Sequence, residues 1–152
     1  MHSKIYQVST SPVKKEDFID ANFIDFMANN VFFDYVIDLT EEEQEVYIAQ
    51  LPTILDGICC VNGRELTIID VAPFCSEWQK KLVKAAESIN PSSMYCQSIK
   101  NILSHTHKDI WSLFYICDWS NEIVTVAEFV NYCSNLEPGS KLYLGGVVDY
   151  HI

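Results

Sequence analysis

The sequence predicts an α+β fold, because helix and strand signals alternate without the regular strand–helix–strand repeat of a parallel sheet. Its clearest strand signal is a local hairpin, residues 57–69, whose two halves must lie antiparallel. A chain of 152 residues also has the commonest size for one domain with one core. We therefore expect a single domain, residues 1–152, with a small mixed or antiparallel sheet packed against about four helices.

The first predicted element is an N-terminal strand at residues 4–9, where polar and apolar residues alternate before a Ser-Thr-Ser-Pro turn. A helix is predicted next, from about residue 15 to residue 38, broken near Asn29-Asn30. Apolar residues at helical spacing support it up to Met27, whereas the period of the following VFFDYVID is ambiguous between helix and strand.

A helix cap and a tight turn predict the next elements. Thr40 with Glu43 three residues later has the form of a capping box and predicts a helix from residue 41, which Pro52 ends or kinks. Asn62-Gly63 suits a tight turn and joins two apolar β-type runs, residues 57–61 and 65–69, into the hairpin.

Pro73 opens the next predicted helix, at a position where its missing N–H costs nothing, and Asn90-Pro91 ends it. Apolar residues at helical spacing mark a stripe that we expect to be buried. The stripe consists of Trp78, Leu82, Ala85, Ala86 and Ile89.

The last third begins with an uncertain segment, residues 92–110, and a buried strand predicted at 111–118. Thr125 as a cap, with Glu128 three residues on, predicts a helix over residues 126–136. The final strand is KLYLGGVVDYH, where Gly145-Gly146 indicates a bulge or a close backbone contact.

The cysteines and the hydropathy of the chain indicate a reduced, cytoplasmic protein. Several of the six cysteines lie inside apolar runs, where a thiol packs like a small hydrophobic group, and no secretory segment follows Met1. We expect all of them to be reduced core residues: Cys59, Cys60, Cys75, Cys96, Cys117 and Cys133. No apolar run approaches the length of a membrane span.

Charge is the unusual feature of the composition, with a formal net charge of −11. Residues 1–56 hold eleven Asp or Glu against three Lys, whereas residues 57–152 hold ten against seven Lys or Arg. Such a surface repels nucleic acids and anionic membranes and attracts basic proteins. The alternative is that the acidity serves only solubility.

The carboxylates of the first third could form one continuous acidic face, with Phe32 and Tyr35 as exposed aromatic anchors. We call this predicted binding surface the acidic face. Its members are Asp20, Asp25, Asp34 and Asp38, expected on the polar side of one helix, and Glu41, Glu42 and Glu45, expected at the start of the next.

One short motif is typical of metal chemistry. His105, His107 and Asp109 have the spacing H-x-H-x-D, which resembles the metal-binding loop of metallo-β-lactamase-fold hydrolases. The resemblance implies a zinc or iron centre that activates a water for hydrolysis. It covers only a few residues, and Ile110 stands where that family carries another histidine.

Two further features could carry chemistry. Asp149 and His151 lie two residues apart in the last strand, so they share a face and could form a general-base pair. Cys75 falls in the first turn of a predicted helix, where the dipole favours a thiolate, although packing in the core is the expected role.

From the sequence we expect a non-catalytic binding or inhibitor module that docks a basic protein and needs no cofactor. In smallness and acidity alone it is similar to immunity proteins and to proteins that mimic DNA. Two alternatives stay open. One is a metal-assisted hydrolase using His105, His107 and Asp109, and the other is an accessory protein that associates with itself.

Overall fold

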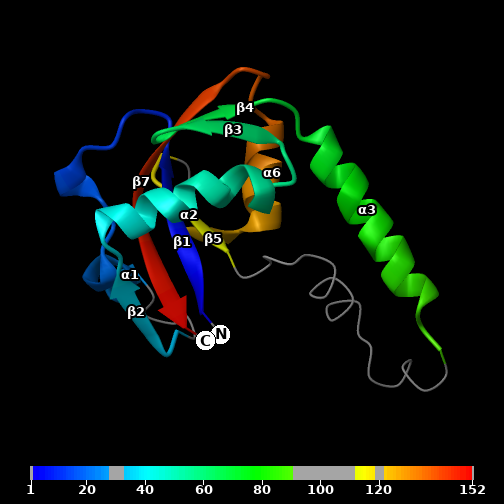
Figure 1. Cartoon of the computed structure of the whole chain (residues 1–152), viewed down its shortest axis with the longest axis horizontal. Coiled ribbons are helices and arrows are strands. Elements are labelled where there is room, and N and C mark those ends of the chain that lie inside the picture. The colour runs from blue at the N-terminus through cyan, green and yellow to red at the C-terminus, as the bar shows by residue number, and fades with distance from the viewer. Residues whose placement is uncertain (1, 28–32, 91–111, 119–121, 152) are drawn as a thin grey trace.

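A computed structural model describes residues 2–27, 33–90, 112–118 and 122–151 of the chain (Figure 1). Its helices are α1 (Ala21–Met27), α2 (Glu41–Ile54), α3 (Ala72–Glu87) and α6 (Val126–Ser134), with a short 3-10 helix η1 (Lys15–Asp17). Its strands are β1 (His2–Ser9), β2 (Tyr35–Asp38), β3 (Cys59–Asn62), β4 (Glu65–Ile68), β5 (Leu113–Ile116), β6 (Ile123–Thr125) and β7 (Lys141–His151). The predicted α+β class is confirmed.

The strands form one mixed sheet in the order β3-β4-β7-β1-β5-β6. β1 and β5 run parallel, and the other pairs are antiparallel. β7 is the longest strand, and one of its edges is paired along its length by β1. On its other edge, β4 pairs with residues 141–143 and β2 with residues 148–151, so residues 144–147 lie between two partner strands.

The two faces of the sheet carry two separate apolar clusters. Tyr6 and Val147 belong to the larger cluster, which α2 and α6 cover, and the ring of Phe129 from α6 stacks 4.0 Å from that of Phe114. The neighbouring residues Ile5 and Val148 point to the opposite face, where α1 covers a smaller cluster. Because His2 at the start of β1 pairs with His151 at the end of β7, the two ends of the chain lie side by side (Figure 1).

Local signals in the sequence are confirmed where they involve neighbouring residues. Thr40 and Glu43 form a complete capping box at the start of α2, and Thr125 and Glu128 form another at the start of α6. The predicted hairpin is β3–β4 around Asn62 and Gly63. Pro52 lies inside α2, which ends two residues later at Ile54.

The glycine pair in β7 is a bulge and also a close contact. The register between β1 and β7 shifts here, since Tyr6 pairs with Val147 but Val8 pairs with Leu144. A Cβ on Gly145 would lie 2.1 Å from Gln7 Oε1, and a Cβ on Gly146 would lie 2.5 Å from the Ile19 carbonyl oxygen. The sequence predicted one or the other of these properties, and the two residues that approach, Gln7 and Ile19, were not predicted.

The helix predicted over residues 15–38 is wrong in its last part. Residues 35–38 are strand β2, and helix α1 covers only Ala21–Met27. In β2, burial alternates from residue to residue: Val36 packs into the smaller cluster while Tyr35 and Ile37 are exposed. Since Tyr35 and Ile37 are themselves apolar, the sequence does not show this alternation. Pairing with β7 decides between the two periods that this short segment allows.

The buried stripe predicted for α3 is also wrong. Phe74 is the buried residue of this helix, Ala86 is exposed, and the other stripe residues are only partly buried. Figure 1 shows α3 extending away from the sheet, whereas α2 and α6 lie against it. An amphipathic pattern therefore identified the helix correctly but not its packing.

The remaining predictions concern segment ends and hydropathy. β5 occupies Leu113–Ile116, inside the strand predicted at 111–118, and β6 was not predicted. The uncertain segment 92–110 lies outside the described residues. None of the described helices is long and apolar enough to cross a membrane.

Candidate functional site

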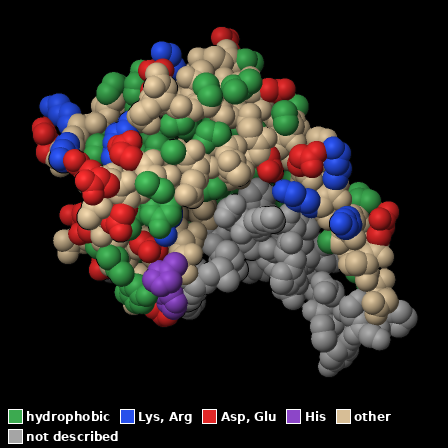
Figure 2. All heavy atoms as spheres, in the orientation of Figure 1, with side chains coloured by type: hydrophobic (Ala, Val, Ile, Leu, Met, Phe, Trp, Pro, Cys, Tyr) green, Lys and Arg blue, Asp and Glu red, His purple; other side chains and the backbone are tan. Residues whose placement is uncertain are grey.

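All seven carboxylates of the acidic face are exposed, but they come from more elements than expected. Asp34 and Asp38 lie before and within β2 rather than on a helix, which corrects their predicted placement. Figure 2 shows Asp and Glu side chains gathered over the left side of the molecule, where η1, α1 and the start of α2 lie in Figure 1. The acidic face is therefore assembled from two helices and an edge strand.

Two of these carboxylates hold the start of α1. Asp20 Oδ1 accepts a hydrogen bond from the Phe23 backbone N–H at 2.7 Å, and Asp38 Oδ1 accepts one from the Ala21 N–H at 2.7 Å. The first N–H groups of a helix lack partners within the helix, so these carboxylates satisfy them. The Asp38 contact also ties β2 to the start of α1.

The next carboxylates lie in the first turn of α2. Glu41 forms an ion pair with Lys15 of η1, and this hydrogen-bonded lysine lowers the pKa of the Glu41 carboxyl. Hydrogen bonds from the Thr40 backbone N–H and hydroxyl likewise lower the pKa of Glu43. Both groups are therefore ionised at neutral pH.

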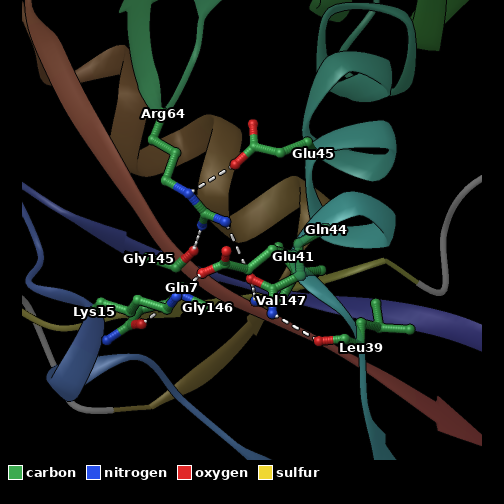
Figure 3. Close-up of polar contacts among 10 residues, drawn as sticks. All are labelled: Gln7, Lys15, Leu39, Glu41, Gln44, Glu45, Arg64, Gly145, Gly146 and Val147. Atoms are coloured by element: carbon green, nitrogen blue, oxygen red, sulfur yellow. Dashed lines mark hydrogen bonds and ion pairs between the residues drawn. The ribbon is translucent and has the colours of Figure 1, made fainter.

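Glu45 pairs with the one arginine of the chain. Its carboxylate lies 2.9 Å from Arg64 Nε, and the same guanidinium donates to Gln44 Oε1 and to the carbonyl oxygen of Gly145 (Figure 3). Arg64 thus fills the space beside residues 144–147 of β7, where neither β4 nor β2 reaches. Its charge is used inside the fold and is not available to bind an anionic ligand.

Gln44 and Gln7 complete this polar arrangement in the middle of β7. Gln44 Oε1 accepts from the Val147 N–H at 3.3 Å, and its Nε2 donates to the Leu39 carbonyl. From the β1 side, Gln7 Oε1 accepts from the N–H groups of Gly146 and Ile19 at 2.8 and 3.0 Å. Neither glutamine was predicted, and the available signal was the polar Gln7 between the apolar Tyr6 and Val8.

Asp25 and Glu42 are the face residues without a structural partner. Their exposed side chains make no hydrogen bond or ion pair with the part of the chain that the structure describes. Hydrogen bonds fix the capping carboxylates without neutralising them. Since Lys15 and Arg64 each neutralise one member, five of the seven carboxylates keep no Lys or Arg partner among the described residues.

A second constellation lies where the two ends of the chain meet. We call it the terminal corner. Its members are His2 and Lys4 of β1, Asp149 and His151 of β7, Tyr35 of β2, and Asp34, which directly precedes β2. His2 lies opposite His151, Lys4 opposite Asp149, and Tyr35 opposite His151 in the ladder. The side chains of the ladder residues share one face of the sheet, and Lys4 Nζ there lies 4.3 Å from the centre of the Tyr47 ring of α2.

The contacts in the terminal corner differ from the predicted Asp149–His151 pair. His151 Nδ1 lies 3.1 Å from Asp34 Oδ2, while Asp149 lies 3.3 Å from both His2 Nδ1 and Lys4 Nζ. The Tyr35 ring stacks on His151 with an interplanar angle of 2°, and its hydroxyl is 3.4 Å from His2 Nε2. His2 was not predicted, because only the strand pairing brings it to Asp149.

The order hydroxyl, imidazole and carboxylate in Tyr35, His2 and Asp149 is the order used in nucleophilic catalysis. However, the hydrogen bonds are long, and the His2 side chain is 55% exposed, so water competes for the same groups. The three groups are therefore in loose contact at the surface rather than joined by short hydrogen bonds.

The predicted metal motif, His105, His107 and Asp109, lies outside the described residues, as does the anchor Phe32. Within the described ranges, no three His, Cys, Asp or Glu side chains are grouped so that they could hold a metal ion.

The cysteines within the described ranges are all free, as predicted, but not all lie in the core. Burial raises the pKa of Cys59 and of Cys133 to about 12, so these thiols stay protonated. Cys60 and Cys75 are exposed, which corrects their expected packing. Cys96 lies outside the described residues.

A small groove runs between α2 and the β3–β4 hairpin. Its volume is about 190 Å³, and its lining is Glu45, Ile48, Ala49, Pro52, Val61 and Gly63. Pockets for small molecules usually have several hundred Å³, so this groove is too small to define a ligand site.

Comparison with known proteins adds no relative to this description. No protein-family model, no curated protein and no solved structure matches the chain.

Proposed function

We propose that this protein is a non-catalytic binding module that docks a basic protein partner through its acidic face. The observation that carries the proposal is the set of five exposed carboxylates without a Lys or Arg partner among the described residues, in the part of the chain with the largest charge excess. Exposed charges of one sign steer an oppositely charged partner and speed its association.

The way in which the carboxylates are held also supports this proposal. Asp20 and Asp38 are fixed by backbone N–H groups, so they present their charge in one position. A surface that is already ordered loses less conformational entropy on binding than a flexible one. Tyr35 and Ile37 add exposed apolar area beside these charges.

The same charge disfavours nucleic acid or an anionic membrane as the partner, because both carry negative charge. The free thiols among the described residues suit a reducing compartment, which supports the cytoplasmic location that is part of this proposal.

The proposal is tested by removing charge where it has no structural role. The double variant Asp25→Asn/Glu42→Gln loses two charges of the acidic face, and the control Glu87→Gln/Glu137→Gln loses two exposed charges elsewhere. Each variant is immobilised, and basic proteins retained from a native lysate at low and high salt are quantified by mass spectrometry. We expect about fivefold weaker retention by the face variant, from about 0.5 kcal/mol per charge.

The control variant should retain the same basic proteins as the unchanged chain, and high salt should release them from both. Retention that is equal for the two double variants, or that does not respond to salt, would contradict the proposal.

A further inference from the structure

The outer edge of β2, the edge away from β7, is the place where the acidic face borders the sheet. Within the described residues β2 pairs with β7 alone. Tyr35 is 43% exposed and Ile37 is 47% exposed, and both lie on the face that carries their ladder partners His151 and Asp149. Asp34 and Asp38 bracket these two residues, and both are exposed.

We infer that the outer edge of β2 binds an extended basic segment of the partner as an additional strand. This inference rests on the proposed function and names its mode of binding. An exposed strand edge offers backbone N–H and C=O groups to a segment in the β conformation, and the flanking side chains then select its sequence.

The side chains around this edge define the segment that would fit. Residues opposite each other in neighbouring strands interact directly, so Asp34 and Asp38 favour Lys or Arg at the two ends of the added strand. Between them, the exposed faces of Tyr35 and Ile37 favour aliphatic residues at alternate positions. The expected pattern is basic, apolar, any, apolar, basic.

The terminal corner holds the aromatic anchor in place before binding. The Tyr35 ring stacks on that of His151, with centroids 5.1 Å apart, and the Tyr35 hydroxyl contacts His2. His151 is itself held by Asp34. Because these contacts already restrict the ring, docking on it costs little additional side-chain entropy.

A second copy of the chain fits this edge poorly. An antiparallel β2–β2 pair centred on Val36 would place Asp34 of each copy opposite Asp38 of the other, and a parallel pair would align identical aspartates. Like charges directly opposite each other destabilise a pair of strands, and each copy carries a net charge of −11. The aspartates thus oppose self-pairing and favour a basic partner.

The test uses synthetic peptides as probes in NMR titrations of the full chain. The first peptide is Gly-Lys-Val-Thr-Val-Lys-Gly, and the second has Pro in place of Thr, which keeps the charge but disfavours a continuous strand. A third peptide has Glu in place of both Lys. We expect amide shifts centred on residues 34–38 with the first peptide, about tenfold weaker binding of the second, and none of the third.

A matched pair of variants checks the location. Ile37→Ser should weaken the first peptide about threefold through the lost apolar contact, whereas Ile69→Ser, at an isoleucine exposed elsewhere, should leave its binding unchanged.

The outcomes separate this inference from the proposed function. Equal, salt-sensitive binding of the first two peptides would overturn strand addition but support docking by charge. Shifts away from residues 34–38, or no binding of any peptide, would also overturn the inference. The lysate comparison of the charge variants then decides the proposed function independently.

Discussion

The middle of β7, residues 144–147, and its C-terminal end, residues 148–151, are held to the sheet in two different ways. At the end, both neighbours are strands, because β1 and β2 pair with it in regular ladders. In the middle, β1 pairs across a bulge and no strand lies on the other side. Side chains take the place of the missing strand there, with Gln44 and Arg64 on one edge and Gln7 on the other.

This difference separates the part of the strand that specifies the fold from the part that is free to serve binding. Gln7 is buried, so its hydrogen bonds have no water to replace them. At the end of the strand the backbone ladder supplies the pairing, and exposed side chains such as Asp34 and His2 can vary at little cost. The proposed docking edge of β2, which lies beside this end of β7, would therefore not compete with the stability of the sheet.

The largest effect is expected from a methyl group in the middle of β7. Gly146→Ala would press Cβ against the Ile19 carbonyl oxygen and nitrogen, both backbone atoms that cannot move aside alone. We expect a loss of about 3 kcal/mol in the free energy of unfolding, measured by urea denaturation.

Gly145→Ala provides the matched comparison, because the three atoms nearest to its Cβ would all belong to the side chain of Gln7. Its cost should fall below about 0.5 kcal/mol when Gln7 is also changed to Ala, whereas the cost of Gly146→Ala should persist. Equal coupling of both glycines to Gln7 would show that the middle of β7 is not held as described.

A loss of about 2 kcal/mol is expected from Gln7→Leu, which keeps much of the side-chain volume but leaves two buried N–H groups and one partly buried carbonyl without partners. These groups are the N–H of Ile19, the N–H of Gly146 and the carbonyl of Asp17. Hydrogen exchange at the two amides should become faster. Gln50→Leu, on the exposed side of α2, is the control and should change stability by less than about 0.5 kcal/mol.

The smallest effect is expected at the end of β7. Asp34→Asn removes the carboxylate that lies 3.1 Å from His151 Nδ1, in a contact where the Asp34 side chain is 68% exposed. Solvent screens such pairs, so the free energy of unfolding should change by less than about 0.5 kcal/mol. A loss as large as that of Gln7→Leu would remove the distinction between the two regions.

The parts of the fold that could be predicted depend on residues close together in the chain. Thr40 with Glu43 and Asn62 with Gly63 act within a few residues, so their capping box and tight turn are visible in the sequence. The helix prediction for residues 35–38 was wrong because their local pattern fits either a helix or a strand, and only pairing with β7 decides between the two. The prediction of a buried stripe on α3 was wrong because a helical pattern of apolar residues does not show whether another part of the protein covers it.

The candidate site divides in the same way. The acidic face was predicted as a set of residues, and all of them are exposed, but their partners could not be predicted. Lys15, Arg64 and the start of α1 reach these carboxylates only after folding. The terminal corner was half visible, since Asp149 and His151 share a face, while His2 comes from the other end of the chain.

The sequence by itself determined the α+β class, the helix caps, the hairpin, the glycine bulge and the excess of negative charge, because each follows from composition or from contacts between near neighbours. The tertiary structure alone decided that residues 35–38 join β7 as an edge strand, that two glutamines and an arginine hold the middle of β7, and which carboxylates have partners. These outcomes depend on contacts between residues that are far apart in the sequence, such as His2 and His151. Such contacts stabilise the fold only when distant strands come together.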